Sequence, residues 1–170
     1  ETGLRVSDVE VMKNRKRISL LFLALIVAML SLTGCNSRVK ETKEVTTGID
    51  VARYQGTIDW SRVGTSSVDF AMVRLGYRSQ KDGSIVEDPN ARYNMQEAQK
   101  NGIKLGAYFF STAITEEEAK EEAKWVTDLI SQYSITYPVV YDCEGYAEPD
   151  SRQYHLTIEE RTDLALVFMK

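Results

Sequence analysis

From Thr47 to the end of the chain, short apolar runs alternate with amphipathic helical segments, an order that few folds accommodate. It predicts βα units around a parallel sheet, because parallel strands need crossover connections that are usually helical. The predicted strands are 48–51, 70–75, 103–110 and 137–143. The predicted helices are a short one near 59–63, one from a cap at Asp88-Pro89 to Asn101-Gly102, one that opens with Thr115-x-x-Glu118, and one from Thr157-x-x-Glu160 to about Met169.

Four βα units make half of an eightfold barrel, and such barrels typically need about 250 residues. We therefore expect an α/β fold, a modified TIM-type (β/α) barrel of which this chain contains only the first four βα units. An open sheet of four strands would expose both edges, which invites association. A complete barrel has no free edge, so we expect a monomer where the barrel is complete.

The N-terminal region has the pattern of a secretory signal. Four basic residues precede an uncharged apolar run at 18–32, which closes with Leu32-Thr33-Gly34-Cys35. The run is shorter than the roughly 20 residues of a membrane-spanning helix. Its end resembles the lipobox of bacterial lipoproteins, whose cysteine receives a lipid; an ordinary cleavage site is the alternative. We expect a signal peptide at 1–35 with its true start at Met12, and an extracytoplasmic chain anchored through Cys35 to the bacterial membrane, facing the cell wall.

Residues 36–46 are polar and lack apolar periodicity, which predicts a linker before a folded domain at 47–170. If Cys35 carries a lipid, Cys143 has no partner for an internal disulfide. The chain has 21 basic and 25 acidic residues. This balance gives no electrostatic reason to expect binding to nucleic acid.

Two carboxylates follow the fourth predicted strand in Tyr141-Asp142-Cys143-Glu144. Side chains alternate along a strand, so Asp142 and Glu144 share one face while Cys143 points to the other. Their backbones lie about 6 to 7 Å apart, close enough for the carboxylates to repel, so one should hold its proton at neutral pH as a general acid must. Asp50 ends the first strand and adds a third carboxylate to the same rim, where parallel barrels carry their active sites.

Tyr77, Tyr108 and Tyr146 lie at or just beyond strand ends, where aromatic rings suit stacking on sugars. The alternatives are that the acids merely begin a polar loop and that each tyrosine only packs. A rim of three carboxylates would also suit magnesium or calcium. Zinc is disfavoured because His155 is the only histidine and Cys143 points away from the acids. We expect no metal and no cofactor.

Five successive motifs resemble the strand motifs of family 25 glycoside hydrolases. They are Gly48-Ile49-Asp50-Val51, Gln55-Gly56-x-Ile58-Asp59-Trp60, Phe70 through Arg74-x-Gly76-Tyr77, Gly106-Ala107-Tyr108-Phe109 and Pro138-Val139-Val140-x-Asp142-x-Glu144. The resemblance implies a lysozyme, a muramidase that hydrolyses the β-1,4 bond between N-acetylmuramic acid and N-acetylglucosamine in peptidoglycan.

By the same resemblance, Glu144 is the general acid that protonates the leaving oxygen, Asp142 orients or charge-stabilises the reacting sugar, and Asp50 supports the acid or the substrate. Gln55 and the three tyrosines would contact the glycan. The nucleophile stays open between a water activated by a carboxylate and the acetamido group of the substrate. Arg53-Tyr54 stands where many relatives carry histidines.

Two other functions fit the same sequence. A half barrel with an export signal is consistent with a noncatalytic peptidoglycan-binding lipoprotein. An acidic rim is also consistent with a metal-dependent barrel hydrolase that acts on a phosphoester.

Overall fold

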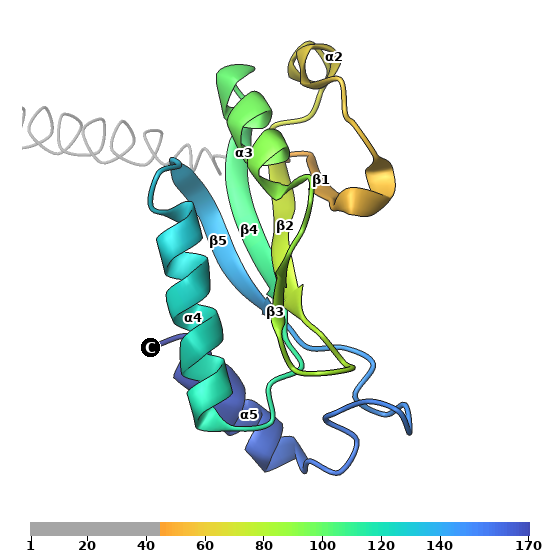
Figure 1. Cartoon of the computed structure of the whole chain (residues 1–170). Helices are drawn as coiled ribbons and strands as arrows, with labels where there is room; N and C mark the ends of the chain where they lie inside the picture. Colours follow the sequence, from red (N-terminus) through yellow and green to blue (C-terminus); the bar gives the residue numbers. More distant parts are fainter. Residues whose placement is uncertain (1–44) are drawn as a thin grey trace, which may run out of the picture. The chain divides into compact units, whose positions relative to one another are not determined.

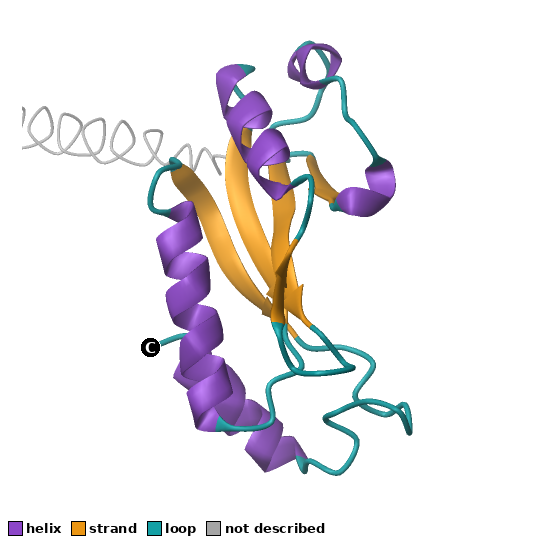
Figure 2. Cartoon of the chain, in the orientation of Figure 1, coloured by secondary structure: helices purple, strands orange, loops and turns teal. Residues whose placement is uncertain are grey.

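The structure, a computed structural model, describes residues 45–170. The predicted signal peptide, Cys35 and nearly all of the predicted linker lie outside these residues. The described part is a sheet with helices packed on it (Figures 1 and 2). Its elements are β1 (Gly48–Val51), the 3-10 helix η1 (Arg53–Gln55), α2 (Trp60–Gly64), β2 (Phe70–Arg78), β3 (Ile85–Glu87), α3 (Ala91–Lys100), β4 (Lys104–Phe110), α4 (Glu116–Ile130), β5 (Ile135–Asp142) and α5 (Ile158–Phe168).

The four predicted strands form one sheet in the order β1-β2-β4-β5, and every pair along this path is parallel. The predicted α/β class with a parallel sheet is therefore confirmed. In Figure 1, α3 lies over β2 and β4, while α4 packs against α5 and also contacts β2. Alternate strand residues pack beneath the helices and are fully buried: Ala71, Val73, Leu75, Leu105, Ala107 and Phe109. The opposite face of the sheet carries the side chains that lie between them along each strand, both apolar and polar, among them Met72, Arg74, Tyr108 and Phe110.

A short antiparallel strand, β3, was not predicted. It pairs with the end of β2, which therefore continues to Arg78, beyond the predicted end at Leu75. The connecting turn contains Asp82-Gly83, a common hairpin signal, and Gly83 has a φ of 72°. Hydrogen bonds from Ser84 are the main reason that the pKa of Asp82 falls to about 2. This turn was the sequence signal that could have revealed β3.

The predicted helix cap at Asp88-Pro89 is wrong. Helix α3 begins at Ala91, after Asn90. The Asp88 carboxylate instead forms a buried ion pair with Arg74, at 2.6 Å between Oδ2 and Nη2. It also accepts a hydrogen bond from the main-chain N–H of Asn90 at 3.0 Å, so it still fixes the turn before the helix. The other predicted strand and helix boundaries agree to within about two residues.

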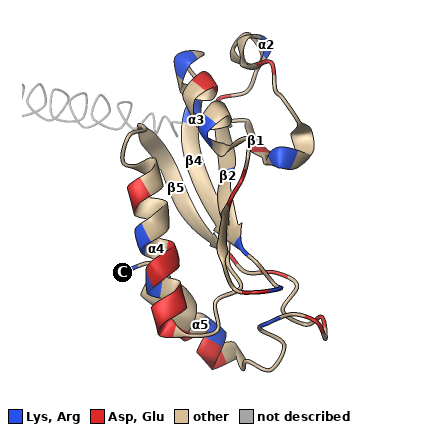
Figure 3. Ribbon diagram, viewed as in Figure 1, with Lys and Arg blue, Asp and Glu red and all other residues tan. Residues whose placement is uncertain are grey.

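The two later helices begin as predicted. The Thr115 hydroxyl accepts from the N–H of Glu118 at 3.2 Å, and the Thr157 hydroxyl accepts from the N–H of Glu160 at 3.2 Å. Glu160 completes the second capping box, whereas the Glu118 carboxylate turns to the N–H of Ile114 instead. Acidic side chains crowd the first turns of α4 and α5 (Figure 3), where helix dipoles favour negative charge. Within residues 45–170, no helix is long and apolar enough to cross a membrane.

Candidate active site

One cleft lies at the carboxyl ends of the parallel strands, and residues of the loops that follow β2 and β5 line it. Its volume is about 920 Å³. Five residues that the sequence predicts for the site line it together: Asp50, Tyr77, Tyr108, Asp142 and Glu144. Active sites of parallel βα folds lie at this end of the sheet, so the position agrees with the predicted location.

The strand register explains why these side chains converge. Parallel pairing sets Asp142 beside Phe110, and Phe110 beside Tyr77, so the three residues form a row across the face of the sheet that borders the cleft. A register shift between Arg74 and Gly76 lies in the middle of β2. Because of this irregularity, Arg74 and Tyr77 both line the cleft although strict alternation would put them on opposite faces.

Asp142 is half-buried at the end of β5. Burial raises the pKa of Asp142 above its ordinary value, the charges of Glu144 and Asp50 raise it further, and Arg74 opposes the change. The neighbouring negative charges disfavour the ionised form of Asp142, which is the direction that the spacing of Asp142 and Glu144 predicts.

Tyr108 lies on β4 and its hydroxyl faces Asp50. Burial raises the pKa of Tyr108, and the adjacent Asp50 carboxylate raises it further. The phenol therefore stays protonated and donates its one O–H to the Asp50 carboxylate, which leaves its oxygen free to accept a hydrogen bond in the cleft. An oriented acceptor beside a carboxylate suits the recognition of hydroxyl and amide N–H groups on a sugar.

Three arginines line the cleft, Arg53, Arg74 and Arg78, and none was assigned to the site from the sequence. Arg74 is buried and donates from Nε and Nη2 to the Asp88 carboxylate at 2.9 and 2.6 Å. Arg53 is exposed in η1 and its main-chain N–H donates to the same carboxylate at 3.0 Å. An arginine in the middle of an otherwise apolar strand was the signal for Arg74, because a buried charge needs a buried partner.

The structure places two other predicted contacts outside the cleft lining. The Arg161 guanidinium lies over the ring of Tyr146, 4.1 Å from its centroid. The Gln55 side chain accepts a hydrogen bond from the main-chain N–H of Ala52 at 2.7 Å, which closes η1. Both roles in glycan binding remain predictions, since neither residue is among those that border the cleft.

Cys143 faces away from the acids, as the alternation predicts. Its thiol donates to the Gln153 amide oxygen at 3.3 Å, and burial raises the pKa of Cys143. His155 packs edge-on against Tyr154 in an exposed loop. Within residues 45–170, no three or more histidine, cysteine, aspartate or glutamate side chains are grouped so as to hold a metal ion.

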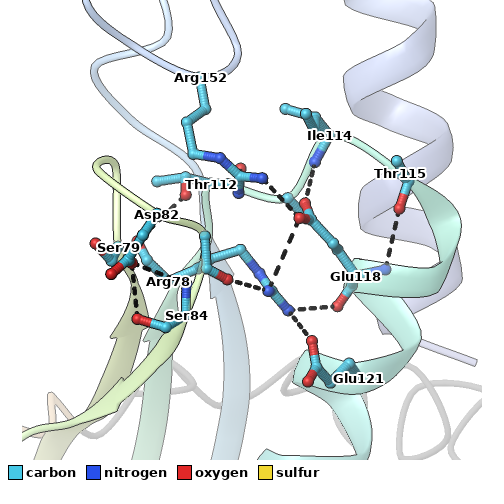
Figure 4. Close-up of polar contacts among 12 residues, drawn as sticks. Arg78, Ser79, Asp82, Ser84, Thr112, Ile114, Thr115, Glu118, Glu121 and Arg152 are labelled. Carbon is cyan, nitrogen blue, oxygen red and sulfur yellow. Dashed lines mark hydrogen bonds and ion pairs between the residues drawn. The ribbon is translucent and has the colours of Figure 1, made fainter.

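Arg78 borders the cleft at the end of β2, and its guanidinium reaches α4 (Figure 4). Its guanidinium donates to Glu122 at 2.7 Å and to Glu121 at 2.8 Å. Arg152, from the loop after β5, pairs with Glu118 at 2.6 Å (Figure 4). These ion pairs join β2, α4 and the loop that follows Glu144.

A parallel sheet of βα units with carboxylates at the carboxyl ends of its strands has the architecture of part of a βα barrel. The model of glycosyl hydrolases family 25 matches residues 49–169, and the chain belongs to this family. The chain is 31% identical over 104 residues to lysozyme M1 of Streptomyces globisporus, covering 57% of this chain and 32% of that protein. It is 30% identical over 114 residues to uncharacterized protein YegX of Escherichia coli (strain K12), covering 66% of this chain and 41% of YegX. The chain thus spans about two fifths of the length of YegX.

Solved structures agree with this assignment. A family 25 glycosyl hydrolase from Bacillus anthracis superposes with a TM-score of 0.58 at 27% identity, covering 75% of this chain and 54% of that one. The modular autolysin LytC from Streptococcus pneumoniae, solved in complex with a synthetic peptidoglycan ligand, gives 0.59 at 26% identity, covering 72% and 28%. The fold is therefore the parallel α/β sheet of family 25, matched over part of those chains.

Proposed function

We propose that this chain carries the catalytic carboxylates of a muramidase, which hydrolyses the β-1,4 bond between N-acetylmuramic acid and N-acetylglucosamine in peptidoglycan. The observation that supports this most is the convergence of Asp50, Asp142 and Glu144 on one cleft in a chain of family 25. The likeness to a lysozyme and to an autolysin with a peptidoglycan ligand supports the same substrate class.

Glu144 acts as the general acid in this proposal. It lies beyond the end of β5 and is exposed to water at the cleft rim. A glycan strand seated in the cleft would exclude that water and bring the leaving glycosidic oxygen within reach of the Glu144 carboxyl, which would protonate it. Proton donation would thus be coupled to substrate binding.

Asp142 and Asp50 act on the reacting sugar. Since burial and its neighbours raise the pKa of Asp142, its carboxyl can orient an acetamido group by hydrogen bonding or stabilise charge on the sugar when ionised. Asp50 holds the Tyr108 hydroxyl beside this point. Two nucleophiles remain candidates, a water activated by a carboxylate and the substrate acetamido group.

The test compares the full chain, kept in nonionic detergent, with Glu144→Gln and with Glu148→Gln, which removes an exposed carboxylate that does not line the cleft. Purified sacculi are incubated with each protein, and released fragments are analysed by mass spectrometry for the reducing-end sugar. We expect reducing N-acetylmuramic acid from the parent and Glu148→Gln, and at least a hundredfold less from Glu144→Gln. Equal release from all three would remove Glu144 from the acid role, and sacculus binding without any release would favour the noncatalytic alternative.

A lipid anchor at Cys35 belongs to the same proposal and rests on the lipobox-like Leu32-Thr33-Gly34-Cys35. Two or more acyl chains would hold the enzyme stably outside the cytoplasmic membrane. Cys35→Ala should move the protein from the membrane fraction to the soluble extracytoplasmic fraction. Unchanged fractionation would contradict the anchor without affecting the proposed chemistry.

A further inference from the structure

The cleft contains a second cluster of side chains besides the carboxylates: Arg53, Tyr54, Arg74 and Tyr77, here called the arginine–tyrosine cluster. The guanidinium carbons of Arg53 and Arg74 lie 5.0 and 4.9 Å from the centre of the Tyr54 ring. They lie 5.8 and 5.7 Å from the centre of the Tyr77 ring. Two cations therefore share two aromatic faces, an arrangement that holds guanidinium groups in place.

The charges in this cluster do not balance. Arg74 is neutralised by Asp88, whose side chain is fully buried. Arg53 shares that carboxylate only through its main-chain N–H. Within residues 45–170, the Arg53 guanidinium makes no ion pair, and its contact with the Tyr54 hydroxyl is a long one of 3.4 Å. The cluster thus presents one uncompensated positive charge, with most of its donors unused, to a cleft that Lys81 also lines.

The cluster has one positive charge in excess, although the chain as a whole has a formal net charge of −4. A hydrogen bond from Arg53 lowers the pKa of Tyr54, and Arg74 lowers it further, as expected where an anion is stabilised. The carboxylates of Asp50, Asp142 and Glu144 make the other part of the cleft negative. An anionic group on a bound molecule would be repelled there and attracted to Arg53.

We infer that the arginine–tyrosine cluster binds an oxyanion carried as a substituent on the glycan strand, with the Arg53 guanidinium as its direct ligand. This inference rests on the proposed muramidase function. It names the substituent that would set the orientation of the glycan strand in the cleft. A carboxylate of the lactyl group or peptide stem matches the planar guanidinium fork, and the phosphate of a phosphorylated strand offers the same charge. A neutral glycan such as chitin would lack the contact.

The test measures equilibrium binding so that it does not depend on turnover. Full chain carrying Glu144→Gln, in nonionic detergent, is titrated with an N-acetylglucosamine–N-acetylmuramic acid tetrasaccharide, with its lactyl methyl ester, and with a phosphorylated form of the ester. Arg53→Gln is compared with Arg53→Lys and with Arg62→Gln, which removes an exposed arginine of α2 that does not line the cleft. Each titration is repeated at low and high salt.

We expect Arg53→Gln to weaken binding of the free carboxylate form about tenfold and to leave binding of the methyl ester unchanged. Arg53→Lys should recover part of the loss, and Arg62→Gln should behave as the parent. Salt should weaken the parent more than Arg53→Gln. A loss for the phosphorylated ester alone would assign the oxyanion to phosphate instead of carboxylate.

Equal effects of Arg53→Gln on charged and neutral tetrasaccharides would overturn the inference. If the parent sequence then still cleaves sacculi, only the inference fails. Charge-dependent binding without cleavage would instead count against the proposed catalysis and leave the oxyanion site standing. Binding of none of the tetrasaccharides would overturn both.

Discussion

Replacing Glu122 with alanine removes a fully buried carboxylate from the interior of α4. Its two oxygens accept hydrogen bonds from Arg78 Nε at 2.7 Å and from the Ser111 hydroxyl at 2.6 Å. The Arg78 side chain is 3% exposed, so the substitution leaves its charge facing only Glu121 and the more distant Glu118. The free energy of unfolding should fall by about 3 to 5 kcal/mol, the typical cost of leaving a buried charge without its partner.

For a folded unit of this size, about 4 °C in melting temperature accompanies each kcal/mol, so the loss corresponds to about 12 to 20 °C. The assay is urea unfolding of the full chain in nonionic detergent at pH 7, followed by fluorescence of Trp60 and Trp125. The control is the double variant Arg78→Met with Glu122→Leu, which replaces the pair by apolar side chains and should recover at least half of the loss. A cost below about 1 kcal/mol for Glu122→Ala would refute the reasoning, because such a value is typical of exposed ion pairs.

Three further predictions concern the cleft and its supports. The raised pKa of Asp142 in the folded chain stabilises the fold at acid pH, and this stability is lost as the pH rises through that pKa. In urea unfolding, Asp142→Asn should therefore gain stability relative to the parent between pH 4 and pH 7. An opposite trend would contradict the pKa shift. Gly76→Ala would place its Cβ 2.5 Å from the Val86 carbonyl oxygen and should cost about 1 to 3 kcal/mol by the same assay. In the Cys35→Ala chain, the Cys143 thiol should react with a disulfide reagent several times more slowly when folded than in urea, because burial raises its pKa.

The sequence predicted the parallel strands well because their apolar runs are strong local signals. Strand β1 has the bounds that its Gly48–Val51 motif predicts, and the capping residues Thr115 and Thr157 start their helices as predicted. Failures occurred where a tertiary contact competes with a local preference. Asp88 has the local pattern of a helix cap, yet its carboxylate is shared between buried Arg74 and the N–H of Asn90, and α3 begins only at Ala91.

The positions of the site carboxylates were also predictable from local strand patterns. Strand alternation and the common carboxyl ends of parallel strands place Asp50, Asp142 and Glu144 together, and the cleft contains all three. Tyr77 was predicted for the site, whereas Arg53, Tyr54 and Arg74 of the arginine–tyrosine cluster were not. Arg53 and Tyr54 lie in η1 and meet Arg74 of β2 only through tertiary contacts, which no pattern within either segment reports.

Ser111 links the buried ion pairs to the cleft, so stability and chemistry depend on one arrangement. Its main-chain N–H donates to the Asp142 carbonyl at 2.8 Å, and its hydroxyl donates to Glu122 at 2.6 Å while lying 3.0 Å from the Tyr141 hydroxyl. The end of β5 is therefore held to α4 through one residue, directly behind the two carboxylates proposed to act on the glycan. Because a displacement of about 1 Å can cost a hundredfold in rate, loss of Glu122 should impair the geometry of Asp142 even in molecules that remain folded. The buried Glu122 carboxylate of α4 thus supports the catalytic geometry in this proposal. An apolar residue at position 122 would let α4 pack on the sheet without fixing the end of β5.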